Sequence, residues 1–409
     1  MKKLCVSRLW SGHAMPNSLL CILLVILCFY CIAVTELMLY RRLSTIRSID
    51  ERHLKTSSKR NFFCHSHCNE TSIQVTPKID STNVTDLNKS SKTIIETIVS
   101  NVKTVVSKQK KQRAINVYKS IKADWTFNAT AAEEFRRLLE NKCKTSEMCL
   151  TSQDSVKIND TLKYTADNDS ILMTSSILDR FPKESPYKWN SFKKCSIVGS
   201  SGILLRSKCG KEIDSADFII RFNLAKTQNF TDDVGSKTSL ITCNPTVIET
   251  KYYRLAENMT EKFRQDIVTE YGNTTLFTQA FNQLHCTPTA FRAQDVLQSA
   301  HVNVVFPHPS YRSLITEFWN DYGIKSTFPS SGLTIMTSFL SFCQEVHMFG
   351  FWPFQVNKHQ KPLPFHYYEP KHIPRPSRLE GRVHNMPSEF NLFKDLHNKG
   401  IIRLHVDKC

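Results

Sequence analysis

The sequence predicts an α/β layered domain with a mostly parallel sheet flanked by helices. Between positions 195 and 248, short apolar runs alternate with turns rich in Gly, Ser and Asn. Farther along the chain, similar runs alternate with segments whose apolar residues have helical spacing. Short apolar runs of this kind are typical of parallel strands that are buried on both faces. Such sheets bind ligands in a crevice at the carboxyl ends of their strands.

The elements are expected in a regular order. Thr130 and Glu133 form a capping box for a first helix, and residues 151–194 are expected to be irregular. Gly199 and Gly202 follow the first strand, where the backbone can approach a ligand because no Cβ intervenes. Strands are expected near 196–198, 217–222, 239–243, 275–281, 302–306, 346–351 and 401–406, and helices near 311–322, 333–343 and 389–398.

A long apolar segment precedes the domain. Residues 18–40 contain one charged residue, Glu36, and are long enough to span a bilayer. A cleaved signal peptide is the less favoured alternative, because no small-x-small cleavage site follows the segment. We therefore expect a cytoplasmic tail at 1–17, a signal-anchor transmembrane helix at 18–40, a lumenal stem at 41–128 and a folded lumenal domain at 129–409.

Nine Asn-x-Ser/Thr sequons place the chain beyond this segment in the secretory lumen. Ten of the 14 cysteines also lie beyond it, where disulfides persist. The formal charge of +17 suits an anionic partner, but nucleic acid is excluded by this compartment. The candidate glycosylation sites are Asn69, Asn83, Asn88, Asn128, Asn159, Asn168, Asn229, Asn258 and Asn273.

Four clusters of polar and aromatic residues are candidates for a functional site. They are Ser330-Ser331-Gly332 before an apolar helix, Trp352 after a strand, the run His366–Glu369, and His384 with Glu389 before the last helix. Each cluster alone has a purely structural interpretation: an N-cap, a core aromatic, a satisfied histidine and a helix entry. Their occurrence together along one lumenal chain argues instead for a shared functional site.

Taken together, these clusters resemble the eukaryotic sialyltransferases, glycosyltransferase family 29. The resemblance covers Phe181–Cys409, and Gly350–Phe354 with the His366–Tyr368 run is most similar to the α-2,8 branch, in particular to its mono- and oligo-sialyltransferases. The large, small, third and very small motifs of the family correspond to Cys195–Ile248, Pro329–Phe351, His366–Glu369 and His384–Glu389.

The resemblance implies a GT-A-like Rossmann-type fold and CMP-N-acetylneuraminate as donor, with no metal or other cofactor. It implies transfer to a sialylated glycoprotein or glycolipid in an α-2,8 linkage, by an inverting single displacement with His384 as general base. His366 is the second catalytic candidate, at the leaving phosphate. The donor-binding residues implied are Ser200, Asn223, Ser330, Ser331, Gly332, Trp352, Phe365 and His366.

The family further implies a single-pass type II protein of the Golgi membrane, with a homodimer as a candidate assembly. The residues themselves agree with a metal-free site. A helix N-terminus at Ser330–Gly332 offers N–H groups and its dipole to a phosphate. The nearest carboxylate pair, Asp232-Asp233, matches no metal motif. Neutral donors and a helix dipole suffice for a monophosphate leaving group.

The resemblance also implies two disulfides, Cys195–Cys343 and Cys209–Cys409. Cys64 and Cys68 flank two histidines, and a disulfide is favoured there over zinc in an oxidising lumen. Cys143 and Cys149 are candidates for a local pair. For Cys243 and Cys286, a bridge and two free thiols both stay open.

Three positions depart from the α-2,8 pattern: Ser200 stands where Asn is usual, Phe222 where Cys is usual, and Ser331 where Thr is usual. The alternative functions are a non-catalytic sialoside-binding membrane protein on a transferase scaffold and a polysialyltransferase. An α-2,3 or α-2,6 enzyme is disfavoured by the His366–Tyr368 run. A polysialyltransferase would need a denser basic stretch than the lysines at 183, 188, 193 and 194 provide.

Overall fold

The computed structural model describes residues 100, 105, 108–109, 111–369 and 384–409. The predicted transmembrane segment at 18–40, most of the predicted stem, and Cys64 with Cys68 lie outside these residues. Within the described part of the chain, no helix combines the length and the apolar character needed to cross a membrane.

The centre of the domain is a parallel sheet, as predicted. Every strand pairing in it is parallel, and the spatial order is β7-β6-β5-β4-β3-β8-β9. The chain enters at β3, runs to one edge, and returns to place β8 on the other side of β3. The strands are β3 (Phe192–Val198), β4 (Phe218–Arg221), β5 (Leu240–Thr242), β6 (Thr275–Phe277), β7 (Asn303–Val305), β8 (Cys343–Phe349) and β9 (Arg403–His405). The order reverses between β3 and β8, which is where sheets of this kind bind ligands.

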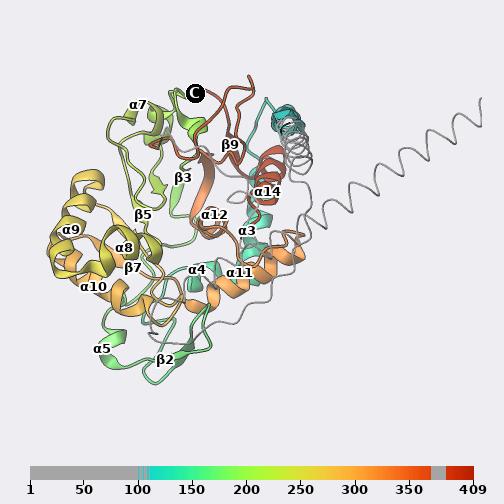
Figure 1. Cartoon of the computed structure of the whole chain (residues 1–409). Helices are drawn as coiled ribbons and strands as arrows, with labels where there is room; N and C mark the ends of the chain where they lie inside the picture. The colour runs from blue at the N-terminus through green and yellow to red at the C-terminus, as the bar shows by residue number, and fades with distance from the viewer. Residues whose placement is uncertain (1–99, 101–104, 106–107, 110, 370–383) are drawn as a thin grey trace, which may run out of the picture. The chain divides into compact units, whose positions relative to one another are not determined.

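Two layers of helices cover the two faces of the sheet. Alternate strand residues point to opposite faces, so that Ile197 and Ile220 join one core whereas Val198 and Ile219 join another. Figure 1 shows α8, α9 and α10 gathered at one side of the domain and α3, α11 and α14 at the other, with α12 between them. The first core receives α3 (Ala129–Cys143), α11 (Pro309–Asp321), α12 (Ser331–Phe342) and α14 (Met386–Asn398), and the opposite face receives α6 (Gly210–Asp214), α8 (Pro245–Lys251), α9 (Glu257–Tyr271) and α10 (Cys286–Gln298).

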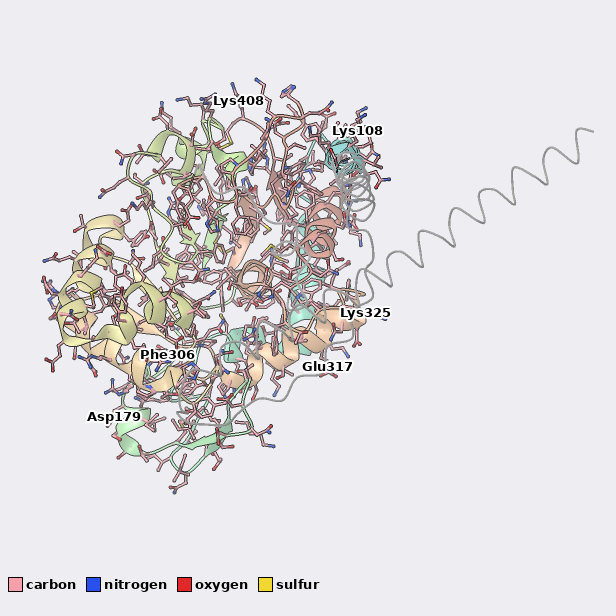
Figure 2. All side chains as sticks on the ribbon, in the orientation of Figure 1. Lys108, Asp179, Phe306, Glu317, Lys325 and Lys408 are labelled. Carbon is pink, nitrogen blue, oxygen red and sulfur yellow. A yellow bond between two sulfur atoms is a disulfide. The ribbon has the colours of Figure 1, made fainter. Side chains whose placement is uncertain are left out.

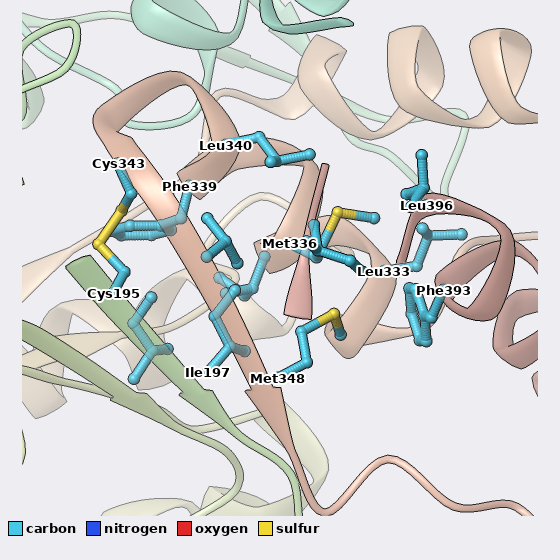
Figure 3. Close-up of a cluster of buried hydrophobic side chains, with 14 of the residues drawn as sticks. Cys195, Ile197, Leu333, Met336, Phe339, Leu340, Cys343, Met348, Phe393 and Leu396 are labelled. Atoms are coloured by element: carbon cyan, nitrogen blue, oxygen red, sulfur yellow. A yellow bond between two sulfur atoms is a disulfide. The ribbon is translucent and has the colours of Figure 1, made fainter. Parts of the chain in front are cut away.

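Helix α12 is buried nearly all round, which explains its almost uninterrupted apolar sequence. Figure 3 shows Met336 and Phe339 of this helix packed with strand residues such as Ile197 and Met348. Its polar residues are also satisfied, because the Thr337 hydroxyl donates to the carbonyl of the preceding turn at 2.7 Å. The helix therefore holds its N-terminus rigidly against the sheet.

Both implied disulfides are present, Cys195–Cys343 and Cys209–Cys409, separated by 148 and 200 residues in the chain. Loops of this length correspond to about 5 kcal/mol each in the chain-entropy model. The predicted local pair of Cys143 and Cys149 is wrong, since both thiols are free and buried. A short helix, α4 (Thr145–Met148), separates them, and burial raises the pKa of each thiol to about 12. Cys243 and Cys286 are free and buried as well.

Several local expectations differ from the structure. The N-cap of α3 is Asn128 rather than Thr130, and its side chain accepts from the N–H of Ala131. The segment 151–194 is not wholly irregular, since it contains an antiparallel pair, β1 (Thr161–Lys163) and β2 (Ser170–Leu172), and a short helix, α5 (Ser175–Leu178). Helices α9 and α10 were not predicted, because only one narrow side of each is buried.

The ordered structure also begins before position 129. Residues 111–119 are helical, and Ala114 is fully buried in the first core. The Trp125 indole donates to the carbonyl of Ile402 at 2.8 Å, and the N–H of Asn128 donates to Gly400 at 3.0 Å. This part of the predicted stem therefore packs on the folded domain.

The surface agrees with the predicted glycan sites. All the sequon asparagines in the described part of the chain are exposed, at positions 128, 159, 168, 229, 258 and 273. Charged side chains such as Asp179 and Lys408 lie at the rim of the molecule, whereas Phe306 is buried in the core (Figure 2). Attachment of glycans at these positions stays a prediction, as it does for Asn69, Asn83 and Asn88 outside the described residues.

Two histidines pack against each other where β8 meets β9. The Nε2–H of His347 donates to the Glu345 carboxylate at 2.9 Å, and its Nδ1 lies 3.2 Å from Nε2 of His405. Burial lowers the pKa of His347 from 6.5 to about 4, although Glu345 opposes the shift. Burial and the neighbouring His347 lower the pKa of His405 too. Both rings are therefore neutral at pH 7.

This pair predicts acid sensitivity of the fold. Because the folded-state pKa of His347 is lowered, its contribution is fully present above pH 6.5 and is lost as the pH falls toward 4. The expected loss is about 3 kcal/mol in the free energy of unfolding at pH 4. Urea unfolding between pH 7 and 4 should show a shallower pH dependence for His347→Gln than for the wild type. The exposed-histidine control His359→Gln should keep the wild-type slope; equal slopes in all three proteins would contradict the prediction.

Candidate active site

A cavity of about 360 Å³ opens at the point where the strand order reverses. Its walls come from the turns after β3, β4 and β8, from the start of α12 and from the segment that leads into α14. The structure brings every predicted catalytic and donor-binding residue to this one cavity. The residues concerned are Ser200, Asn223, Ser330, Ser331, Gly332, Trp352, Phe365, His366 and His384.

The floor of the cavity depends on a close contact between two turns. A Cβ on Gly199 would lie 2.6 Å from the carbonyl oxygen of Gly350, and a Cβ on Gly350 would lie 2.7 Å from that of Gly199. The glycines therefore allow β3 and β8 to approach each other at their ends. Gly202 likewise faces Pro364. Gly199 lines the cavity with its backbone, as expected, whereas Gly202 does not line it and packs against Pro364 instead.

Ser330 and Glu389 join the start of α12 to α14. Ser330 is the N-cap of α12, and its hydroxyl accepts from the N–H of Leu333 at 3.2 Å. The Glu389 carboxylate accepts both the Ser330 N–H, at 2.9 Å, and the Ser330 hydroxyl. Burial raises the pKa of Glu389, and the two Ser330 donors oppose this shift. Glu389 thus orients the start of α12, while the N-cap of α14 is Asn385.

The first turn of α12 faces the cavity with Ser331 and Gly332. Backbone N–H groups in a first helical turn have no intrahelical acceptor, and the helix dipole adds positive potential there. A Cβ on Gly332 would lie 2.6 Å from the Phe351 ring, so that a glycine is required for this packing. The arrangement suits an anion such as a phosphate.

His384 is held in a defined tautomer. Its Nδ1 lies 2.9 Å from the carbonyl oxygen of Phe328. A carbonyl can only accept a hydrogen bond, so Nδ1 carries a proton, and in the neutral imidazole Nε2 is the nitrogen with the free lone pair. His384 also lines a second cavity of about 300 Å³, together with Asn244 and Ser331, which line the first cavity too. The imidazole therefore stands where the two cavities meet.

His366 reaches the site through a short backbone pairing. An isolated antiparallel β-bridge pairs Ser201 with His366, and the N–H of Tyr367 donates to the Ser200 carbonyl at 3.0 Å. The His366 ring stacks on Tyr368, and its Nδ1 lies 3.1 Å from a Glu369 carboxylate oxygen. Tyr367 is buried and structural, so the run contributes one side chain to the cavity.

Trp352 and Asn223 form two more walls. Trp352 is only 4% exposed and its indole donates to the Val356 carbonyl at 2.8 Å, so it offers the cavity an apolar surface. Asn223 adopts a positive φ of 52°, and its side-chain oxygen accepts from the N–H of Asn244 at 3.1 Å. Asn244 was missed from the sequence; the strand end before Pro245, which begins a helix, was the available signal.

Acidic groups are scarce at this site. Among the described residues that line the first cavity, Glu389 is the only carboxylate, and it is committed to Ser330. Asp233 instead accepts from the N–H groups of Arg206 and Lys208, and Asp232 pairs with the Lys208 ammonium at 2.7 Å. The cavity is thus suited to an anionic ligand.

Comparison with known proteins decides the family. Residues 139–401 match glycosyltransferase family 29 (sialyltransferase). The chain belongs to this family. The match includes His366 and His384, as well as the disulfide Cys195–Cys343.

Curated relatives of this sialyltransferase-family chain are named as α-2,8-sialyltransferases. Alpha-2,8-sialyltransferase 8E of Rattus norvegicus is 34% identical over 75% of this chain and 80% of its own length. Alpha-2,8-sialyltransferase 8F of Mus musculus is 33% identical over 70% and 71%, respectively. An alpha-N-acetylneuraminide alpha-2,8-sialyltransferase of Xenopus laevis is 32% identical over 70% and 78%. The crystal structure of a mammalian sialyltransferase aligns with 72% of this chain at 18% identity and a TM-score of 0.37.

The Glu389–Ser330 contact predicts a stability difference between two substitutions. Glu389→Ala leaves the buried Ser330 N–H without its acceptor and should cost about 1–3 kcal/mol in the free energy of unfolding. Glu389→Gln keeps a carbonyl acceptor and should cost less. Urea unfolding measures both, with the exposed Glu134→Ala on α3 as control. A Glu389→Ala loss no larger than that of the Glu134→Ala control would show that the carboxylate does not hold the helix start.

Proposed function

We propose that this family 29 member transfers sialic acid from CMP-N-acetylneuraminate to a sialylated glycan, forming an α-2,8 linkage. The observation that carries the proposal is the position of His384, which lines two adjoining cavities and whose Nδ1 is held by the Phe328 carbonyl. A group-transfer enzyme needs a base at the junction between donor and acceptor. The α-2,8 names of the curated relatives support the linkage.

The donor is assigned to the cavity at the start of α12. There the phosphate of the CMP group would accept from backbone N–H groups of Ser331 and Gly332 and from His366. Trp352 and Phe365 would supply apolar surface to the sugar and exclude water. This cavity needs no metal ion, because the leaving group carries one phosphate.

The acceptor hydroxyl would approach from the second cavity. As its oxygen bonds to C2 of the donor sugar, Nε2 of His384 takes the hydroxyl proton. The bond from C2 to the phosphate oxygen breaks on the opposite side, and its electron pair leaves with CMP. A single displacement of this kind inverts the configuration at C2. Phe328 keeps the imidazole aligned throughout, because its carbonyl fixes Nδ1–H.

We further propose a single-pass type II protein of the Golgi membrane whose catalytic domain is lumenal. The apolar segment at 18–40, the sequons beyond it and the two disulfides support this placement. In cells, the domain should be protected from protease in intact vesicles and should shift in mass on treatment with an N-glycosidase. Cleavage in intact vesicles, or the absence of N-glycans, would place it elsewhere.

The function is tested by CMP release and by linkage analysis of the product. The purified protein is mixed with CMP-sialic acid and with sialylated O-glycans, N-glycans or gangliosides. An α-2,8-linked product on at least one acceptor is expected. Binding of these glycans without CMP release would instead favour a sialoside-binding protein, and long chains of sialic acid would favour a polysialyltransferase.

His384→Ala should lower the kcat of transfer by roughly 100-fold to 10,000-fold, because the hydroxyl proton loses its acceptor. Its thermal unfolding and its affinity for CMP should match those of the wild type. His359→Gln, an exposed histidine, is the matched control and should keep full activity. A His384→Ala variant that retains most of its kcat would remove the base assignment.

A further inference from the structure

The second cavity is lined by a cationic side chain that the proposed mechanism does not use. Arg312, on α11, lines this cavity together with His384. One guanidinium nitrogen, Nη1, donates to the side-chain oxygen of Asn282 at 2.6 Å. No carboxylate of the described chain forms a salt bridge with Arg312, and burial by itself lowers the pKa of its guanidinium. A mostly buried cation without a counter-ion is costly to keep unless a ligand supplies the charge.

Phe328 holds both Arg312 and His384. Its ring lies 3.9 Å from the Arg312 guanidinium carbon, and its carbonyl accepts from Nδ1 of His384 at 2.9 Å. The flat face of the guanidinium is therefore stacked on an aromatic ring, while its edge carries donors that Asn282 uses only in part. An anion bound at this edge would lie within the same small cavity as the proposed base.

The other charged groups around the cavity do not neutralise Arg312. Glu249 lines the cavity, but its carboxylate lies 2.9 Å from Nε2 of His285 and 3.9 Å from Nε of Arg254. His308 also lines it, and burial lowers the pKa of that imidazole, which favours its neutral form. Arg312 is thus the fixed positive charge among the described lining residues.

We propose that this second cavity binds the terminal sialic acid of the acceptor, and that Arg312 binds its carboxylate. The inference rests on the proposed transfer to a sialylated glycan. A terminal sialoside carries its carboxylate on C2 and the attacking hydroxyl on its glycerol side chain. The planar fork of Arg312 matches a carboxylate in two parallel hydrogen bonds, and this pairing would orient the hydroxyl toward His384. A glycan that ends in a neutral sugar lacks the anion.

The test compares two acceptors and two variants. Sialyllactose and its sialic acid methyl ester differ only at the carboxyl group, which is charged in the acid and neutral and methylated in the ester, so both keep the attacking hydroxyl. The wild type should use the free acid on the order of 100-fold better than the ester in kcat/KM, as expected for a buried charge pair. Arg312→Met should lose this discrimination by lowering kcat/KM for the acid alone. The KM for CMP-sialic acid should not change.

Two controls keep the result interpretable. Arg292→Met, an exposed arginine on α10, should behave as the wild type. Arg312→Lys retains the charge but loses the fork, so it should keep part of the discrimination; it carries the test if Arg312→Met does not fold. The inference is overturned if either folded Arg312 variant distinguishes acid from ester as strongly as the wild type does. A wild type that releases no CMP with either acceptor would contradict the proposed function itself.

Discussion

The site depends on the close approach of β3 and β8, two parallel neighbours that lie far apart in the sequence. The disulfide Cys195–Cys343 joins the two strands toward one end, and the facing glycines 199 and 350 bring their carboxyl ends into backbone contact. Parallel strands place successive carboxyl ends at one edge of a sheet, so loops from both halves of the chain meet there. Any side chain at either glycine would separate the strands and widen the floor of the cavity.

A second constraint orients the N-terminal end of α12, the proposed phosphate site. A helix N-terminus attracts anions only when its first N–H groups are directed at the ligand. Here a buried carboxylate from α14, Glu389, accepts both donors of Ser330 and so sets the direction in which the helix begins. The contact spans 59 residues of sequence. It also explains why an acidic residue is tolerated beside a proposed phosphate site, since each of its oxygens accepts a hydrogen bond from Ser330.

Phe328 has the same organising role for the other side of the site. Its carbonyl sets the tautomer of His384, and its ring supports Arg312. One residue thus connects the proposed base with the proposed acceptor charge. The groups follow one another from the start of α12 through His384 to Arg312, so the proposed leaving phosphate and the proposed acceptor carboxylate lie on opposite sides of the proposed base.

The sequence alone determined the α/β class, the strand positions near 196, 218, 240, 303 and 346, and the four clusters that line the first cavity. These features are local: buried strands, N-caps and motifs are encoded by neighbouring residues. Both disulfides also followed from the family resemblance.

By contrast, the sequence missed or misplaced α9 and α10, the β1–β2 pair and the Asn128 cap, since weakly amphipathic segments acquire their structure from packing. Gly199 both lines the cavity and allows the close approach to Gly350, whereas Gly202 serves only packing against Pro364. Only the tertiary structure decided three features: the contact of Glu389 with Ser330, the junction of the two cavities at His384, and the lack of a carboxylate partner for Arg312 among the described residues. Each depends on residues that lie far apart in the sequence, so no local pattern predicts it.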